Sequence, residues 1–213
     1  MGKMEYFLVV VVSFIVLLFL FRAATGYKSY KNAIFPHLYD NYLIDYFYKI
    51  NVQNDISKSG KLKKLIGRHR IVYSTVSNRE GQIVTQLCTI IHTKGIVTFA
   101  YMNPGGELHG KDTGNWYVRR DDGEGLKNYK IENPVVHLKE YDEHVKKVTE
   151  GKGILKAVAV SDNADTSHVL LNTAKLVKFS EVPDFIQNSE CDYGLNDIEI
   201  DEIYQKLGGK IDK

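Results

Sequence analysis

The sequence has little cysteine and almost no net charge. Its two cysteines, Cys88 and Cys191, are too few for a disulfide framework and favour a reducing compartment, where a buried thiol behaves as a small apolar side chain. The sequence contains no CxxC pair, no histidine and cysteine cluster at zinc spacing, and no Walker-type phosphate loop. The 28 basic and 26 acidic residues leave a formal charge of +2, so composition alone does not indicate nucleic-acid binding.

One long apolar run stands near the N-terminus, at positions 6–21 (YFLVVVVSFIVLLFLF). At ~1.5 Å per residue a helix of this run spans roughly 24 Å, and Arg22, Ala23 and Ala24 extend it toward the ~30 Å of a bilayer core. Its 14 Leu, Ile, Val and Phe residues favour insertion by at most roughly 4–8 kcal/mol. The run therefore predicts a single-pass transmembrane helix that contacts the lipid bilayer through residues 6–21.

The flanking residues favour an uncleaved anchor over a signal peptide, which is the main alternative. Glu5 cancels the charge of Lys3, and no small-x-small cleavage site follows the run. Tyr6 occupies the position where a myristoylation signal needs Ser or Thr. Positive charge lies mainly after the helix, at Arg22, Lys28 and Lys31. The positive-inside rule thus predicts a cell-membrane protein whose C-terminal domain is cytoplasmic.

Four segments are predicted along the chain: a transmembrane anchor (1–26), a juxtamembrane helix and linker (27–60), an α/β domain (61–190), and an acidic helix with a tail (191–213). Tyrosine and aliphatic residues dominate positions 27–50, where Tyr42 and Tyr46 recur at helical spacing. This pattern predicts an amphipathic helix packed on the domain or lying at the membrane surface. An aromatic ligand-binding patch is the less favoured alternative.

Strand and helix patterns alternate through the rest of the chain. Runs of β-branched and aromatic residues predict strands at 71–76, 83–93, 95–103, 115–119, 154–160 and 175–179. Helices are predicted at 62–66, after the cap formed by Asn133 and Pro134, and at 196–207. Meander strands followed by helix and strand indicate an α/β fold, with a mixed central sheet flanked by helices and preceded by the transmembrane helix.

Several short motifs follow one another in order between residues 62 and 186. They are Gln86-Leu87-Cys88, Gly95-Ile96, Asn103, Gly106, Gly110, Trp116, Asn133-Pro134, and the closing runs 157–161, Asp165 and 176–183. This ordered set resembles the nuclease-related domain (NERD) family, although no single dipeptide in it is specific. Because that family is related to the PD-(D/E)xK nucleases, the resemblance implies a restriction-endonuclease-like fold.

The resemblance also implies where nuclease chemistry would reside. Such enzymes hold Mg²⁺ with an Asp and a Glu on adjacent strands and place the attacking water with a Lys. The matching positions here are Cys88, Ala100 and Met102, so the catalytic set is degenerate and no cofactor is expected. We expect these three side chains to converge on one packed face of the sheet. If they lie apart, the family mapping is wrong.

Other residues provide weaker candidates for a metal or hydrolytic site. Cys88 and His92 are predicted on one strand face, but two ligands are too few for zinc. A displaced Mg²⁺ site would draw on carboxylates at Glu107, Asp112, Asp121, Asp122 and Asp55. No Ser or Cys stands at motif spacing from the remaining candidate bases, His137, His144 and His168. Solvated or packed side chains are the favoured interpretation of all of them.

One basic cluster precedes the predicted sheet. It comprises Lys61, Lys63, Lys64, Arg68 and Arg70. These residues could contact nucleic-acid phosphate or anionic lipid, although a solvated face is the favoured interpretation.

These observations predict a membrane-anchored cytoplasmic domain that has lost nuclease catalysis. It would act as a binding or scaffold module, with a nucleic acid or a membrane protein as its partner. The first alternative is an active Mg²⁺-dependent nuclease that uses the displaced carboxylates. The second is a structural membrane-associated protein whose partner surface includes Tyr42 and Tyr46.

Overall fold

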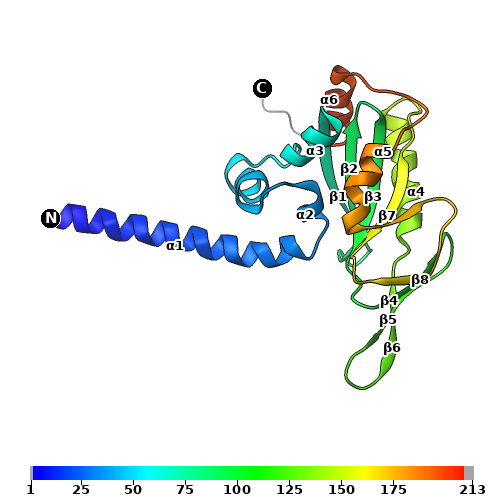
Figure 1. The fold of residues 1–213 in the computed structure, drawn as a ribbon, viewed down its shortest axis with the longest axis horizontal. Coiled ribbons are helices and arrows are strands. Elements are labelled where there is room, and N and C mark those ends of the chain that lie inside the picture. Colours follow the sequence, from blue (N-terminus) through cyan, green and yellow to red (C-terminus); the bar gives the residue numbers. More distant parts are fainter. Residues whose placement is uncertain (1, 209–213) are drawn as a thin grey trace.

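A single long helix, α1 (Lys3–Lys31), projects from the rest of the molecule in the computed structural model, which describes residues 2–208 (Figure 1). Its apolar section is exposed, and the helix is long and apolar enough to cross a membrane. The helix continues unbroken through the predicted boundary at residue 26. Gly26 lets Tyr42 of the juxtamembrane segment pack closely against this helix, because the hydroxyl of Tyr42 lies 2.7 Å from the position that a Cβ on residue 26 would occupy. The predicted C-terminal tail beyond residue 208 lies outside the described residues.

The juxtamembrane segment is made of short helical pieces. These are α2 (Phe35–Leu38), then two wide π-type turns, η1 (Tyr42–Phe47) and η2 (Lys49–Gln53). Asn41 caps η1 by accepting hydrogen bonds from the backbone of Leu43 and Ile44. The predicted single amphipathic helix is therefore wrong in type, although its aromatic side chains do pack inward. Tyr30, Phe35, Tyr39 and Tyr46 form a chain of ring contacts that joins α1 to the domain.

The central sheet has five strands in the order β1-β2-β3-β7-β9. Their bounds are β1 (His69–Ser77), β2 (Ile83–His92), β3 (Gly95–Met102), β7 (Leu155–Val160) and β9 (Lys175–Lys178). The first three pair antiparallel as predicted from their hairpin turns, whereas β7 is parallel to both β3 and β9. The prediction of an α/β fold with a mixed sheet flanked by helices is confirmed.

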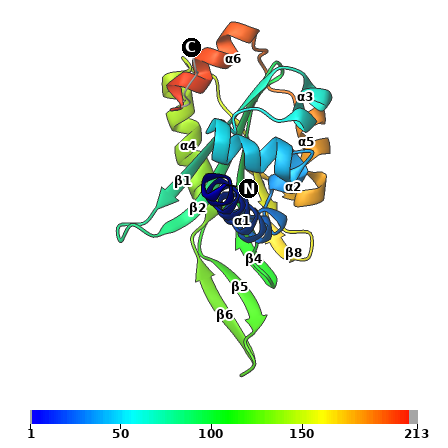
Figure 2. The same cartoon turned by 90° about the vertical axis from the view of Figure 1, so that its left-hand side faces the viewer.

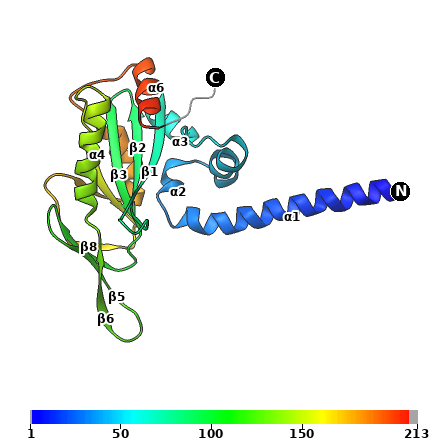
Figure 3. The ribbon, with the colours of Figure 1, turned by 180° about the vertical axis from the view of Figure 1, so that it is seen from behind.

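Helices cover both faces of this sheet. On one face lie α2, α3 (Gly60–Ile66) and α5 (Val182–Asn188), which follows the short 3₁₀ turn η3 (Phe179–Glu181). On the other lie α4 (Pro134–Val148) and α6 (Asp197–Lys206), seen from behind in Figure 3. We refer to these as the α5 face and the α4 face. Burial on both sides explains why β3 reads as a nearly continuous apolar run.

A second sheet of four strands, in the order β6-β5-β4-β8, extends below the central one (Figure 2). Its strands are β4 (Glu107–Lys111), β5 (Trp116–Asp121), β6 (Leu126–Ile131) and β8 (Asp165–Leu170). One side packs into the α4-face core through Leu108, Trp116 and Val118. Only β5 was predicted among these strands, and it belongs to this sheet rather than to the central meander.

Candidate functional site

The residues that correspond to nuclease positions do not share one face of the central sheet. In the β2–β3 hairpin, Cys88 is paired with Phe99, whereas Ala100 is paired with Leu87. Paired residues share a face and successive residues alternate, so Cys88 lies on the α5 face while Ala100 and Met102 lie on the α4 face. The predicted convergence of the three side chains is therefore wrong at Cys88, and Leu87 is the residue of β2 that stands opposite Ala100.

The α4 face around Ala100 is filled with apolar side chains. Leu87 and Ala100 are buried, and they belong to one core cluster with Trp116 and Val160, against which Met102 also packs. Mg²⁺ requires oxygen ligands, and the side chains of this cluster supply none. A hollow of about 270 Å³ beside Met102 is lined by a single carboxylate, that of Glu132. The strand positions that the resemblance assigns to nuclease catalysis are thus occupied by core packing.

On the opposite face, Cys88 is an inert core residue. Its side chain is fully buried, and burial raises the pKa of the thiol to about 12, so it remains protonated. His92 is also buried, and burial lowers its pKa to about 4. Four residues along a strand separate the two Cα atoms by roughly 13 Å. The Cys88–His92 pair therefore cannot share a metal ion.

Most of the carboxylates proposed for a displaced site serve as local caps. Asp112 accepts hydrogen bonds from the backbone of Asn172 and Thr173, which fastens β4 to the turn after β8. Asp121 accepts from the backbone within the β5–β6 turn, and Asp122 pairs with Lys127. Asp55 caps the loop before α3 through the backbone of Ser57. These four carboxylates are therefore explained by the turns that they hold.

A buried carboxylate that the sequence reasoning did not single out is Asp142 of α4. It accepts hydrogen bonds from the backbone N–H of Ile154 at 2.8 Å and from Lys156 at 3.0 Å, and it pairs with Lys146. Burial acts to raise the pKa of Asp142, but these bonds outweigh it and hold the pKa below its usual range. Because its oxygens are already occupied, Asp142 acts as a clamp between α4 and β7.

The basic cluster is partly consumed by internal pairing. Arg70 is buried and donates to Asp201 at 2.6 Å and to Ser57 at 3.1 Å, with its guanidinium 5.1 Å from the ring centre of Tyr204. Arg68 also pairs with Asp201. Arg70 is thus a structural residue that holds α6 against β1, and its predicted contact with phosphate is wrong because the side chain is not accessible.

The lysines of the cluster have different environments. Lys64 pairs with Asp40 at 2.5 Å, and Lys61 donates to the carbonyl of Pro36. Lys63 is exposed and lines a hollow of about 640 Å³ that Lys58 and Arg68 also line. Asp197 is the one carboxylate among the lining residues of this hollow. An excess of positive charge therefore remains at its rim, and we call it the basic hollow.

The histidines predicted as candidate bases are separated in space. His137 approaches Glu140 on the surface of α4, and His144 is exposed on the same helix. His168 on β8 lies beside His109 on β4, a residue that the sequence reasoning missed. Glu107 completes a group whose ligand atoms all lie within 4.8 Å of one another. The spacing Glu107-x-His109, which places both side chains on one face of a strand, was the sequence signal for this group. The third residue, His168, lies on a strand far along the chain, so the sequence did not connect it to the other two.

Comparisons with known proteins gave no match. No protein-family model, no curated protein and no solved structure is detectably similar to this chain.

Proposed function

We propose that this protein is a membrane-anchored, NERD-like domain that binds a partner and has no nuclease activity. The observation that carries the proposal is the packing of the α4 face. Leu87, Ala100 and Met102 stand where adjacent strands would present two carboxylates and a lysine, and all three contribute to an apolar core. On the face of the Leu87–Ala100 pair, the side-chain oxygens of these two strands are hydroxyls, among them those of Thr89 and Thr98, which bond each other. Without carboxylates at the three positions, the metal-dependent hydrolysis of the related nucleases has no basis.

Two features of the fold support the NERD resemblance. Helix α3 precedes the antiparallel strands β1 to β3, and after β4, β5 and β6 of the second sheet helix α4 leads to the parallel strand β7, which gives the mixed sheet that the resemblance implies. The matched residues Gly110 and Trp116 also depend on each other, because a Cβ on Gly110 would lie 2.3 Å from the indole ring. Taking Leu87 rather than Cys88 as the counterpart of the family's Asp puts the degenerate positions on one sheet face, but it gives up the match of Gln86-Leu87-Cys88 to the family motif.

The exposed apolar section of α1 supports membrane attachment. A helix with so many exposed aliphatic and aromatic side chains is stable in lipid rather than in water. The cations that follow the apolar run, Arg22, Lys28 and Lys31, favour a cytoplasmic location for the domain. In this arrangement the protein holds a binding surface close to the inner side of the cell membrane.

The basic hollow favours nucleic acid as one class of partner. Lys58 and Lys63 line it and are exposed, and neither is part of an ion pair within residues 2–208. Exposed lysines of this kind contact phosphate as point charges, independent of sequence. The alternative partner in this proposal is a protein that binds a different surface of the domain.

The proposal is tested with the full chain reconstituted in nanodiscs. We expect no cleavage of single- or double-stranded DNA in the presence of Mg²⁺ or Mn²⁺. Cleavage that is abolished by Glu107→Ala or Asp112→Ala would instead establish the displaced-carboxylate nuclease.

The same sample distinguishes the partner classes. If nucleic acid is the partner, DNA binding will weaken steeply with salt and will fall several-fold in the double variant Lys58→Glu/Lys63→Glu. The matched control is Lys130→Glu/Lys147→Glu, which changes charge equally at exposed lysines outside the hollow. Equal losses in both variants would show that only overall charge matters, and an absence of DNA binding would favour a protein partner.

A further inference from the structure

We propose that Glu107, His109 and His168 form a binding site for a divalent transition-metal ion, with Zn²⁺ the best match to their chemistry. The site lies in the second sheet, where β4 and β8 run parallel and His109 is directly paired with His168. Glu107 stands two residues before His109 and thus on the same sheet face. The proposal does not depend on the proposed function.

The distances between the candidate ligand atoms are close to those of a metal site. Oε1 of Glu107 lies 2.7 Å from Nε2 of His109 and 3.0 Å from Nε2 of His168. Ligands ~2.0–2.1 Å from a tetrahedral Zn²⁺ stand roughly 3.3 Å apart. To admit an ion, the carboxylate must withdraw by a few tenths of an ångström, and the two imidazole nitrogens, which lie within 4.8 Å of each other, must turn toward the same point.

His109 has an unused nitrogen directed into this group. Its Nε2 is buried and forms no hydrogen bond, because the short approach of Glu107 does not have hydrogen-bond geometry. Among the described residues, Nε2 of His92 and of His137 are also buried without a hydrogen bond, so this feature points to an ion at His109 only because two further ligand atoms lie beside it. A bound metal would give this nitrogen a ligand bond in place of an unsatisfied lone pair.

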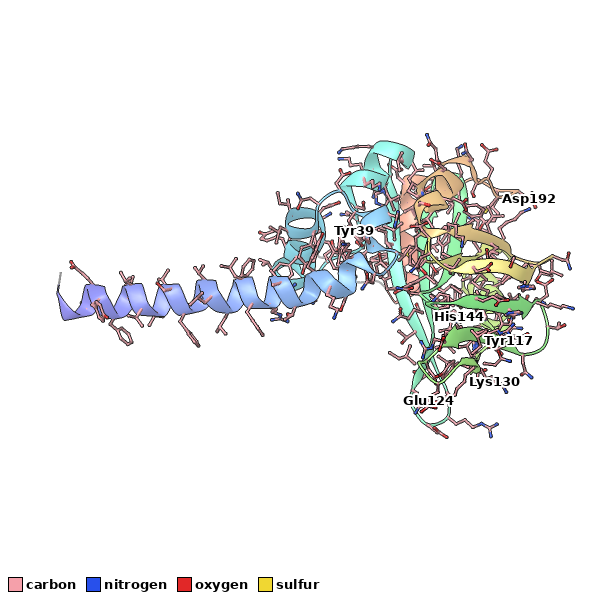
Figure 4. All side chains as sticks on the ribbon, turned by 60° about the horizontal axis from the view of Figure 1, so that its bottom comes forward. Tyr39, Tyr117, Glu124, Lys130, His144 and Asp192 are labelled. Carbon is pink, nitrogen blue, oxygen red and sulfur yellow. The ribbon has the colours of Figure 1, made fainter. Side chains whose placement is uncertain are left out.

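Ring stacking fixes one ligand and leaves the other adjustable. The His109 ring lies between Tyr117, with centroids 4.5 Å apart, and His168, also at 4.5 Å. Because the two imidazole rings are parallel, the lone pairs of their nitrogens point in parallel directions, and one ring must rotate before both can bind the same ion. His168 can do so because 55% of its side chain is exposed. Figure 4 shows Tyr117 on the side of the molecule away from the free end of α1.

Two imidazoles and one carboxylate are a ligand set that zinc proteins use when a fourth position stays open for water or another ligand. The exposure of His168 leaves that position toward solvent. The ion would also join β4 to β8, which are brought together from distant parts of the chain. We therefore expect binding to stabilise the second sheet.

The test uses the full chain in detergent micelles, freed of metal with a chelator and titrated calorimetrically with ZnCl₂. We expect one ion per chain, and a visible absorption band when Co²⁺ replaces Zn²⁺. His168→Ala should weaken binding by at least ~10-fold, since loss even of an outer-shell partner costs about that much. Because His168 is exposed, this variant should fold like the parent chain, and circular dichroism checks it.

The matched control is His137→Ala/Glu140→Ala, which removes a histidine–glutamate pair on α4 that has no third ligand beside it among the described residues. The His137 side chain is only 15% exposed, so circular dichroism checks the fold of this variant as well. This variant should bind Zn²⁺ like the parent chain. Absence of stoichiometric binding in the parent chain, or equal affinity in His168→Ala, would overturn the metal site.

A separate observation concerns the apolar surface of η1 and η2, and this second inference rests on the proposed membrane attachment. Leu43, Ile44 and Val52 are each more than half exposed. The same segment is fastened to α1, because Phe47 contacts Phe19 edge-to-face at 5.1 Å and Tyr42 donates to the carbonyl of Ala23 at 2.7 Å. Phe19 lies inside the apolar run of residues 6–21.

We infer that η1 and η2 are embedded in the interfacial layer of the same membrane that α1 crosses. If Phe19 lies at the acyl boundary, its contact places Phe47 at nearly the same depth. The exposed apolar side chains of η1 and η2 continue the lipid-facing surface of α1 at that level, which is the arrangement of an interfacial amphipathic segment. Lipid is therefore the occupant that this surface fits.

Bromolipid quenching of added tryptophans tests the inference in reconstituted vesicles of the full chain. The native Trp116 is buried in the domain and supplies a constant background. Ile44→Trp should be quenched strongly, whereas Leu170→Trp, equally exposed but on the second sheet, should not. Phe14→Trp in α1 reports separately on membrane attachment. Quenching at Phe14→Trp without quenching at Ile44→Trp would overturn the inference alone. No quenching at either would overturn the membrane attachment as well.

Discussion

Replacing Trp116 with alanine is expected to lower the free energy of unfolding by about 3–5 kcal/mol. The side chain is completely buried in the α4-face core, where it joins the second sheet to the central one. Its Nε1 also donates a hydrogen bond to the carbonyl of Lys111 at 2.7 Å. Truncation would remove a large apolar contact and leave a cavity between the two sheets. This cavity cannot close unless the sheets move relative to each other.

Two variants separate these contributions. Trp116→Phe keeps most of the apolar volume but loses the hydrogen bond, so its cost should be about 1–2 kcal/mol. Leu126→Ala removes an exposed side chain of β6 in the same sheet and should change stability by less than about 0.5 kcal/mol. Urea denaturation of the full chain in micelles, followed by circular dichroism, measures all three. A cost below about 1 kcal/mol for Trp116→Ala would contradict the packing described here.

The central sheet was largely predictable because its strands are apolar on both faces and bounded by clear turns. The N-cap Asn133 with Pro134 likewise marked the start of α4 correctly. The second sheet was not predictable in the same way. Strands β4 and β8 are short and present charged or polar residues on their outer side. They pair in parallel although they are far apart along the chain, so neither contains a local signal for the other.

The error at Cys88 has a definite physical cause. A shift of one residue in strand register moves every side chain to the opposite face. Thr93 and Lys94 form a two-residue turn that pairs His92 with Gly95. Counting outward equally on both strands from that pair brings Leu87, and not Cys88, opposite Ala100. The motif resemblance placed the residues along the chain, but the hairpin determines which face they occupy.

The internal pairing of the basic cluster followed from a contact that no local pattern contains. Arg70 was a reasonable phosphate ligand in the sequence, since nothing near it in the chain neutralises its charge. Its partner, Asp201, is more than a hundred residues away on α6. The proposed metal site was missed for the same reason. Glu107 and His168 were each considered separately, and only the β4–β8 pairing brings them together.

Replacing Asp201 with asparagine should lower the free energy of unfolding by about 2–4 kcal/mol. Removing one partner of a buried ion pair costs ~3–5 kcal/mol, because the remaining charge stays desolvated, and we reduce this range since a quarter of the Asp201 side chain is exposed. The asparagine oxygen can still accept a hydrogen bond from Arg70, which also keeps its bond to Ser57, so the loss is that of the negative charge facing the buried guanidinium. The exposed Glu202→Gln on the same helix is the matched control, with an expected change within about 0.5 kcal/mol.

The cost of Asp201→Asn should also depend on pH in a definite direction. Burial acts to raise the pKa of Asp201, but the bonds and positive charges of Arg70 and Arg68 outweigh it and hold the pKa below its usual value. A carboxylate with a lowered folded-state pKa stabilises the fold above its unfolded pKa of ~3.9 and loses this contribution as the pH falls through the folded value. The difference in unfolding free energy between the parent chain and Asp201→Asn should therefore be constant from about pH 5 to 8 and shrink below about pH 4. Urea denaturation across this range measures it, and a difference that grows on acidification would contradict an ionised Asp201 as the tether between α6 and β1.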